Sequence, residues 1–315
     1  MTADVLPVLR AKVRAVAHPA AEACVCGSET SVLADRPDGT VVRHAGTVAK
    51  AHAADTDSGE LAARMAIAAH PRLDGILLPP LRPSAVESHG RPVTFWPYGS
   101  PVDRDDPDAA PWEAAATLLA RLHRTPRSAL PPGIPPMRGP AKAARAVARL
   151  HAAGPHPAAA PVLRAWAVLP PWARDEAPTP YARTLCHGDL HLGQLVRTRG
   201  GVWLLIDIDD LGLGEPAWDL ARPAAWFACG LLPLDEWARF LTAYQQAGGP
   251  AVPADSDPWP ALDVPARALT VQTAALAIAK SLAAERPLDE VETSVIDACG
   301  RMATHPPELA GEYAT

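Results

Sequence analysis

The sequence lacks most of the features that mark secreted, membrane-spanning and nucleic-acid-binding proteins. Its 315 residues contain only five cysteines, odd in number and mostly scattered, which argues against a disulfide framework and favours a reducing compartment. The N-terminus has no apolar core of signal-peptide length, and no stretch approaches the ~18 uncharged apolar residues of a membrane span. The formal net charge is −6 without a block of lysine or arginine, so no nucleic-acid partner is expected. We therefore expect a cytoplasmic protein without a membrane partner.

What the sequence has in quantity is apolar residues and proline. The hydrophobic fraction is 48% and many of these residues are alanine, which predicts a sizeable, helix-rich core. The 36 prolines cluster between the predicted elements and form no repeat. A chain of this length predicts one large domain or two modest ones.

The first part of the chain predicts a small antiparallel sheet with one helix. Short apolar runs bounded by turn residues are typical of strands, and the Asp38-Gly39 turn indicates a hairpin. The predicted strands cover 31–34, 41–44, 47–52, 75–78 and 92–95. Ser58 suits the N-cap of a helix over 58–68, whose apolar residues recur at helical spacing. Turn-forming residues at 96–99 end this region.

The second part of the chain predicts mostly helices. Apolar residues recur at helical spacing in several segments, and Pro111 suits the first turn of one of them. The predicted helices cover 111–123, 141–153, 159–168, 234–247, 264–284 and 288–302, and another begins at 216. The predicted fold class is therefore α+β, with a small antiparallel β lobe over residues 1–97 and a larger, mostly helical lobe over residues 98–315.

The most informative residues form a short loop around Asp189. In the run Cys186-His187-Gly188-Asp189-Leu190-His191-Leu192-Gly193-Gln194, an amide side chain follows the carboxylate by five residues, and Asp207 ends an apolar strand. The two strands between Gln194 and Asp207 predict a hairpin that brings these side chains together. A lone aspartate in a glycine-containing loop more often caps its own turn, but these neighbours favour a catalytic interpretation.

These residue types suit phosphoryl transfer. One carboxylate orients the acceptor hydroxyl and takes its proton, while an amide oxygen and a second carboxylate hold Mg²⁺ on the phosphates of ATP. Mg²⁺ prefers oxygen ligands and needs only one or two from the protein when phosphates supply others. We therefore interpret Asp189 as the catalytic residue, and Gln194 and Asp207 as the metal ligands.

Two further segments fit a nucleotide site. Lys50 lies in the middle of a predicted strand, where it is either a solvated side chain or a phosphate contact paired with Glu60 on the next helix. Trp96 and Tyr98 lie at the predicted hinge, where they either fill a lobe boundary or contact adenine, mainly through the backbone. We assign all four residues to cofactor binding, although the chain has no clean glycine-rich phosphate loop.

The histidines and cysteines offer weaker patterns for metal binding. His187 and His191 lie four residues apart, but Gly188 disfavours a helix there, so we favour structural roles for both histidines over a zinc-dependent hydrolase. Cys24 and Cys26 are too close for ordinary metal-ligand spacing, and no partner pair lies nearby in the sequence.

Other carboxylates follow Asp207 closely. Asp219 falls in the first turn of the helix that begins at 216, where it suits the helix dipole, and we expect it to brace the site loop without contacting substrate. Asp209 and Asp210 are either supports of the site or solvated charges, and the sequence does not distinguish the two.

At these residues the chain resembles the aminoglycoside phosphotransferase and choline-kinase-like family, whose fold is similar to that of eukaryotic protein kinases. The matching segments are 187–194, 206–207 and 212–221. The family usually has asparagine where this chain has Gln194, and the glutamine is similar to that of the bacterial maltokinase branch. After Asp207 the sequence resembles antibiotic phosphotransferases more than maltokinases. Beyond residue 223 we find no diagnostic motif.

The resemblance implies a bilobal, protein-kinase-like enzyme that transfers the γ-phosphate of ATP, with Mg²⁺, to a hydroxyl of a small molecule. It implies that Asp189 is the base or orienting carboxylate and that Gln194 and Asp207 bind Mg²⁺. It also implies that Lys50, held by Glu60, contacts the α- and β-phosphates. The enzyme would be a small-molecule kinase, active as a monomer or homodimer.

The acceptor stays open between an antibiotic, such as an aminoglycoside or related natural product, and a sugar. The alternatives are a sugar kinase of primary metabolism and, in another class, a nucleotide-binding pseudoenzyme or regulatory module. A polycationic acceptor would suit carboxylates, for which the candidates are Asp235, Glu236, Asp255 and Asp257. A neutral sugar would suit aromatic and polar groups, for which the candidates are Trp166, Trp226 and Trp259.

Overall fold

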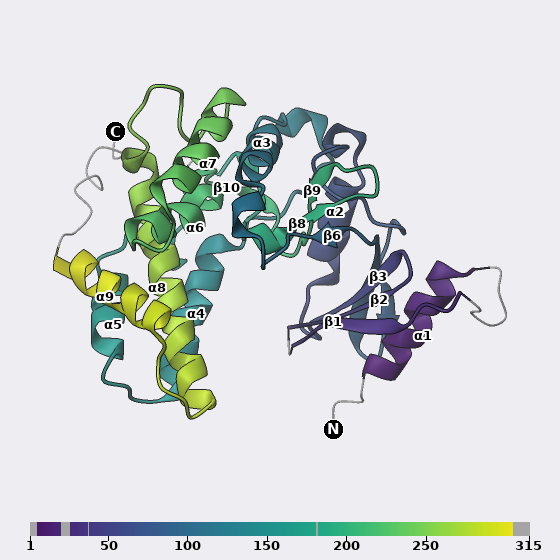
Figure 1. The fold of residues 1–315 in the computed structure, drawn as a ribbon, viewed down its shortest axis with the longest axis horizontal. Coiled ribbons are helices and arrows are strands. Elements are labelled where there is room, and N and C mark those ends of the chain that lie inside the picture. The colour runs from purple at the N-terminus through teal and green to yellow at the C-terminus, as the bar shows by residue number, and fades with distance from the viewer. Residues whose placement is uncertain (1–4, 20–25, 37, 181, 305–315) are drawn as a thin grey trace. The chain divides into compact units, whose positions relative to one another are not determined.

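The computed structural model describes residues 5–19, 26–36, 38–180 and 182–304. The chain divides into two compact units, which are described here one at a time (Figure 1). The first unit comprises Met1–Ala110, Ser128–Pro135 and Gly193–Asp209, and the second comprises Pro111–Arg127, Pro136–Leu192 and Asp210–Thr315. The first unit therefore includes the hairpin that ends before Asp209. The predicted lobe boundaries, 1–97 and 98–315, placed this hairpin in the second lobe.

The first unit is built on a five-stranded antiparallel sheet in the order β1-β2-β3-β5-β4. Its strands are β1 (Thr30–Arg36), β2 (Gly39–His44), β3 (Thr47–His52), β4 (Val86–Ser88) and β5 (Arg91–Pro97). In β3, Ala49 and Ala51 are buried, and Lys50 between them points to the other face of the sheet. The strand alternation predicted from the sequence thus places the lysine away from the apolar core.

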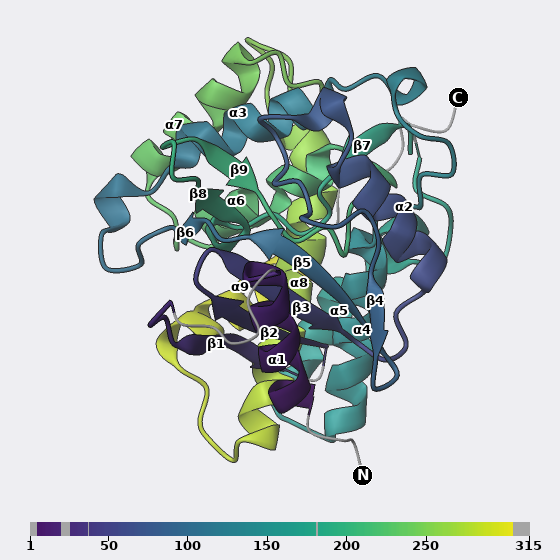
Figure 2. The same cartoon turned by 90° about the vertical axis from the view of Figure 1, so that its right-hand side faces the viewer.

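A helix that was not predicted from the sequence covers the apolar face of this sheet. Helix α1 (Val5–Ala17) presents Val5, Leu9 and Val13, spaced by four residues, and Figure 2 shows it lying across the sheet. These side chains form one core with apolar residues of the strands, namely Val42, Ala49, Ala51, Val93 and Phe95.

The helix α2 and one strand of the first unit differ from their predictions. Helix α2 (Ser58–Ala68) has Asp57, not Ser58, as its N-cap, because the Asp57 carboxylate accepts a hydrogen bond from Glu60 N at 2.8 Å. The predicted strand at 75–78 is wrong, because Gly75 turns the chain with a φ of +69°. Only an isolated bridge joins Leu77 to Leu205, and the sheet edge is taken by β4.

The hairpin predicted between Gln194 and Asp207 is present in the first unit. It pairs β8 (Leu195–Arg197) with β9 (Trp203–Leu205), and β6 (Ser100–Pro101) extends it on the other side of β8. Beside the hairpin lies a second small core, formed by Leu78, Trp96, Val196, Leu204 and Ile206. This core fixes the two strand ends from which Gln194 and Asp207 project.

The second unit is a helical assembly around the long helix α8 (Figure 1). Its helices are α3 (Trp112–His123), α4 (Gly139–Ala153), α5 (Ala159–Ala167), α6 (Ala217–Ala228), α7 (Leu234–Gln246), α8 (Trp259–Ala283) and α9 (Glu290–Thr304). Helices α4, α5, α6 and α9 all contact α8, while α3 packs on α7. The predicted helices match these within a few residues, and the largest difference is that α8 begins at Trp259 where the prediction begins at 264.

A two-stranded ribbon in the second unit carries the loop around Asp189. Strand β7 (Thr184–Cys186) leads directly into the loop and pairs with β10 (Gly212–Gly214). Helix α6 follows β10 after two residues. Within the described ranges of the chain, no helix is both long and apolar enough to cross a membrane.

Candidate functional site

Lys50 binds two carboxylates of the first unit. Its Nζ lies 2.6 Å from Asp207 Oδ1 and 2.8 Å from Asp209 Oδ2. Burial opposes the charge on Lys50, but the two carboxylates outweigh it and hold its pKa above the usual range. The lysine is therefore a fixed cation at the end of the β8–β9 hairpin, and the solvated alternative is wrong.

Asp207 has a left-handed backbone conformation, which is uncommon for residues other than glycine. Its φ is +65°, in the left-handed region, which costs a residue other than glycine roughly 1–2 kcal/mol. Such residues often mark functional positions, because the surrounding structure must compensate for the strain. The conformation turns the carboxylate toward both Lys50 and the side chain of Gln194.

Gln194 and Asp207 come together as the hairpin predicted. The Gln194 amide nitrogen donates to Asp207 Oδ2 at 3.3 Å, and Gln194 O accepts a hydrogen bond from Ile206 N. The side chains of one amide and one carboxylate at adjacent strand ends supply oxygen atoms, which are the metal ligands that a hard cation such as Mg²⁺ prefers. The residues present therefore fit the metal that the sequence implies.

Asp209 belongs to the same cluster, although the sequence did not separate it from a solvated charge. Besides Lys50, it contacts His52 Nδ1 at 3.2 Å, and His52 Nε2 lies 2.9 Å from Thr94 Oγ1. Burial raises the pKa of Asp209, but Lys50 and His52 outweigh this effect and hold it well below its usual range. Asp209 is thus a permanent anion that anchors Lys50 to the sheet.

The expected ion pair between Lys50 and Glu60 is not formed. Both residues are described by the structure, and the Glu60 carboxylate instead accepts a hydrogen bond from Arg64 Nη1 at 2.9 Å, one turn further along α2. The arginine competes successfully because residues four apart on a helix are neighbours. A role for Glu60 in nucleotide binding remains a prediction.

The predicted hinge residues have partners within the first unit. Trp96 belongs to the core beside the hairpin and donates from Nε1 to Thr94 Oγ1 at 2.9 Å. The backbone N–H of Tyr98 donates to Gly46 O, and the Arg43 guanidinium lies 3.4 Å above the Tyr98 ring. The Tyr98 amide is thus engaged by the turn between β2 and β3, and the adenine contact remains a prediction.

In the second unit, two cations hold Asp189. Lys142 Nζ of α4 lies 2.6 Å from Asp189 Oδ2, and Arg222 Nη2 of α6 lies 2.7 Å from Asp189 Oδ1. Burial raises the pKa of Asp189, but Lys142 and Arg222 outweigh burial and hold it below its usual value. Lys142 also contacts Asp210 Oδ2 at 2.8 Å. Asp189 is therefore an oriented anion and a weak base.

Neither of these cations was predicted from the sequence. Arg222 directly follows the segment 212–221 that carries the family resemblance, so its position held a usable signal. Lys142 lies 47 residues before Asp189 in an alanine-rich helix, and nothing in the surrounding residues marks it as part of the site.

Asp219 braces the loop that carries Asp189, as predicted. Its carboxylate accepts hydrogen bonds from His187 N at 2.6 Å and Gly188 N at 2.7 Å, and its Oδ2 lies 2.9 Å from His123 Nε2. Gly188 has a φ of +88°, and a Cβ there would overlap the backbone oxygen of Asp210. Glycine is therefore required at this turn of the loop.

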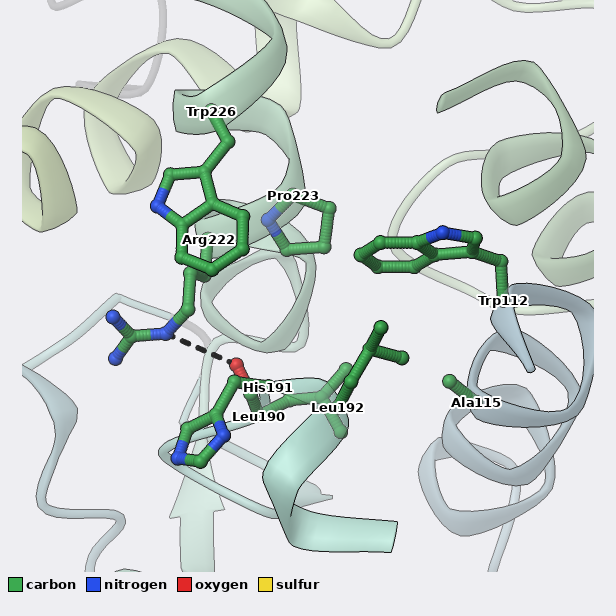
Figure 3. Close-up of a pocket in the computed structure, with 8 residues that line it drawn as sticks. All are labelled: Trp112, Ala115, Leu190, His191, Leu192, Arg222, Pro223 and Trp226. Atoms are coloured by element: carbon green, nitrogen blue, oxygen red, sulfur yellow. Dashed lines mark hydrogen bonds between the residues drawn. The ribbon is translucent and has the colours of Figure 1, made fainter. Parts of the chain in front are cut away.

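A recess adjoins Asp189 in the second unit (Figure 3). Figure 3 shows the indoles of Trp112 from α3 and Trp226 from α6 on either side of Pro223, with Leu192 between the two helices. The full lining is Trp112, Ala115, Leu190, His191, Leu192, Arg222, Pro223 and Trp226. Arg222 donates from Nε to Leu190 O at 3.2 Å and from Nη2 to Asp189 Oδ1, so the recess includes one of the two cations that hold Asp189.

The recess contains one of the side chains that the sequence offered as acceptor candidates. Of the predicted tryptophans only Trp226 lines it, whereas Trp259 is part of an aromatic stack with Phe227 and Trp237. No carboxylate is among its lining residues. The candidate carboxylates Asp235, Asp255 and Asp257 are exposed, and Glu236 accepts a hydrogen bond from Trp112 Nε1.

The phosphotransferase enzyme family matches residues 32–262 of the chain, which is well over half of its length. No curated protein matches the chain significantly. The matched range contains the Lys50 cluster in the first unit and the Asp189 loop with its two cations in the second.

Solved structures of phosphotransferases share the fold. A choline/ethanolamine kinase family protein from Mesorhizobium loti has 18% identity and a TM-score of 0.59, over 97% of this chain and 96% of that chain. A macrolide 2′-phosphotransferase from Brachybacterium faecium has 18% identity and a TM-score of 0.53, over 95% and 99%. A thermostable mutant of aminoglycoside phosphotransferase APH(4)-Ia, in a ternary complex with AMP-PNP and hygromycin B, has 15% identity and a TM-score of 0.57, over 88% of this chain and 95% of that chain. The predicted α+β, protein-kinase-like fold is confirmed.

Proposed function

Because the chain belongs to the phosphotransferase enzyme family and is a small-molecule kinase, we propose that it transfers the γ-phosphate of ATP to a hydroxyl group of its acceptor. One observation carries this proposal. Asp207, in a strained left-handed conformation, faces the cation of Lys50 and the amide of Gln194. A phosphate-binding lysine and a pair of oxygen ligands are the groups that nucleotide binding in phosphoryl transfer requires.

In this proposal, Gln194 and Asp207 hold Mg²⁺, with Asp209 keeping Lys50 in place. When bound there, Mg²⁺ would supply charge neutralisation and orientation of the phosphates. Lys50, which is already aligned by Asp207 and Asp209, contacts the phosphates when the nucleotide is present. The longer side chain of glutamine, compared with the usual asparagine, is accommodated because Gln194 reaches Asp207 across the hairpin.

Asp189 orients the acceptor hydroxyl in this proposal. Its low pKa makes it a weak base, but the transition state of phosphoryl transfer is loose and needs little proton removal before the bond to phosphorus forms. Positioning then supplies most of the rate enhancement. Arg222 and Lys142 act by holding both oxygens of Asp189 in one orientation.

We further propose that the acceptor is a neutral hydroxyl compound with an apolar face. Two indoles, a proline and two leucines line the recess beside Asp189, and its polar side chains are the Arg222 guanidinium and the His191 imidazole. A polycation such as an aminoglycoside would meet an arginine there and no carboxylate, so this lining disfavours the aminoglycoside hypothesis. A sugar ring suits this lining better, because its C–H face packs on an indole such as that of Trp226, which is only partly buried, and its hydroxyls bond with polar groups at the edge.

The alternative is a pseudoenzyme that binds nucleotide without turnover. A turnover screen of the wild type and two variants distinguish this alternative from an active enzyme. The wild type is screened for ATP consumption over neutral sugars, sugar alcohols, macrolides, nucleosides and aminoglycosides. The Asp207→Asn variant, which removes a metal-ligand charge, should lose the thermal shift produced by ATP with Mg²⁺. The Asp189→Asn variant should keep that shift and lose turnover.

The expected shift follows from mass action, because a ligand at 100 times its Kd stabilises the folded protein by about 2.7 kcal/mol. Mg²⁺ is omitted in the control and not chelated, so that other bound metals stay in place. A wild type that binds ATP with Mg²⁺ but consumes none with any acceptor would favour the pseudoenzyme. A wild type with no nucleotide-dependent shift would contradict both interpretations.

A further inference from the structure

Three potential metal ligands meet in the first unit, and the proposed function uses none of them. His18 directly follows α1, Cys26 precedes β1, and His44 ends β2. One ligand atom from each lies within 4.8 Å of the other two, and Cys26 Sγ lies 3.4 Å from His44 Nε2. The sequence shows no such pattern, because the three residues come from separate segments of the chain. Cys24 lies outside the described residues.

The separation of these atoms fits a tetrahedral metal site. Zinc binds cysteine sulfur at about 2.3 Å and histidine nitrogen at about 2.0–2.1 Å, so the sulfur and nitrogen of a tetrahedral site lie roughly 3.5 Å apart. The observed 3.4 Å between Cys26 and His44 therefore needs almost no adjustment. The rings of His18 and His44 meet edge to face at 5.3 Å between centroids, which leaves room for an ion between their nitrogens.

The second nitrogen of His44 has the partner that metal-binding histidines usually have. His44 Nδ1 lies 3.1 Å from Thr30 Oγ1, which also accepts a hydrogen bond from Arg14 Nε at 2.9 Å. Histidine ligands commonly donate their other ring N–H to an oxygen, and this bond fixes the ring and its tautomer. The arrangement presents Nε2 of His44, which is 1% exposed, toward Cys26.

His18 supplies an independent observation. Its Nε2 is buried and has no hydrogen-bond partner among the residues that the structure describes, which costs about 1–3 kcal/mol for a buried polar atom. Such an atom needs a specific explanation, and an ion is one of the usual ones. Cys26 is exposed, so an ion has a path to the site.

A second cluster of similar composition shows the contrast. His123, Cys186 and Asp219 also bring their ligand atoms together, but both nitrogens of His123 are engaged there, with Asp219 Oδ2 at 2.9 Å and with the Tyr244 hydroxyl at 2.8 Å. That cluster is a satisfied hydrogen-bond network that braces the Asp189 loop. The cluster of His18, Cys26 and His44 instead leaves a nitrogen unsatisfied within the described part of the chain.

We propose that His18, Cys26 and His44 bind one zinc ion, or a divalent cation of the same class, with a solvent molecule in the remaining position. Two imidazoles and one thiolate suit zinc better than magnesium or calcium, which prefer oxygen ligands. The ion would tie the end of α1 to β2 and to the chain before β1. The site stands whether or not the proposed phosphotransferase activity holds.

The proposal is tested on the full chain, purified without a polyhistidine tag and with zinc in the growth medium. Elemental analysis should find about one zinc per chain, and replacement by Co²⁺ should give the thiolate charge-transfer absorption of a single cysteine ligand. The Cys26→Ser variant should lose that absorption and most of the zinc. The matched control Cys229→Ser, a cysteine of the second unit outside the cluster, should keep both.

A measurement on the wild type covers the case in which a variant fails to fold. Cys26 should resist alkylation while zinc is bound and react after chelation, as read by mass spectrometry of its peptide, while chelation should also lower the Tm. The His18→Gln variant should show an alkylation rate that chelation does not change, whereas His151→Gln, an exposed histidine of α4, should behave as the wild type. Absence of stoichiometric metal after zinc supply, or equal alkylation with and without the chelator, would overturn the proposal.

Discussion

Asp189 is a carboxylate whose chemistry is set by two cations, Lys142 and Arg222, which hold its pKa below the ordinary value of 3.8. A carboxyl with a depressed pKa stabilises the fold above its unfolded pKa, and this contribution is lost as the pH falls through the folded pKa. Asp189 is therefore ionised at neutral pH. We expect the loss of activity that follows protonation of Asp189 to lie below about pH 4.

The Lys142→Met variant tests this assignment at the residue scale. The variant removes one charge-assisted contact, worth about 1.5–3 kcal/mol. Burial raises the pKa of Asp189 and would then be opposed mainly by Arg222, so this pKa should rise. The acid limb of kcat/KM should then move to higher pH, by about one pH unit or more. Lys280→Met, an exposed lysine of α8, is the matched control and should leave the profile unchanged. A Lys142 variant whose profile superimposes on that of the wild type would refute the role given to this lysine.

At the scale of elements, the loop that follows β7 depends on one glycine. Gly188→Ala forces alanine into a left-handed conformation, at about 1–2 kcal/mol, and also drives its Cβ into the backbone of Asp210. Gly133→Ala is the matched control, because Gly133 also has a positive φ but an added methyl group would meet no described atom within 4 Å. Urea unfolding should show a clearly larger loss for Gly188→Ala. Equal losses would mean that the loop adjusts freely.

The recess between α3 and α6 makes a separate prediction about the acceptor. Trp226→Ala removes one of the two indoles that line it. The KM for the acceptor found in the screen should rise about tenfold or more, while the KM for ATP stays unchanged. Trp166→Ala on α5, outside the lining, serves as the control. If both variants raise the two KM values alike, the recess is not the acceptor site.

The elements also show what sequence patterns can predict. The strands around Lys50 and the hairpin between Gln194 and Asp207 were predictable because alternation and turn residues determine them locally. The Gln194–Asp207 contact followed from that hairpin. The helix α1 and the strand β4 were not predicted, because each depends on packing against strands formed elsewhere in the sequence. For the same reason, the pairing of Lys50 with Asp209 and of Lys142 with Asp189 could not be foreseen.

At the scale of the whole molecule, the chain assigns different tasks to its two units. The first unit holds Lys50, Gln194 and Asp207, and the second holds Asp189 with its two cations. Around these residues, the chain passes from one unit to the other after Leu192 and again after Asp209. The neighbouring carboxylates Asp209 and Asp210 therefore belong to different units, and each binds a lysine of its own unit.

In the proposed reaction, the γ-phosphate of ATP reaches a hydroxyl of a small molecule, and Asp189 directs this transfer. The direct test follows ATP labelled in its γ-phosphate, with Mg²⁺ and the acceptor panel, and identifies the labelled product by mass spectrometry. The label should appear in a phosphate ester of one acceptor class, and Asp189→Asn should reduce its formation about 100- to 10,000-fold while still binding nucleotide. Label found only in inorganic phosphate with every acceptor would rule out transfer to a hydroxyl, and an Asp189→Asn variant as active as the wild type would rule out the role of Asp189.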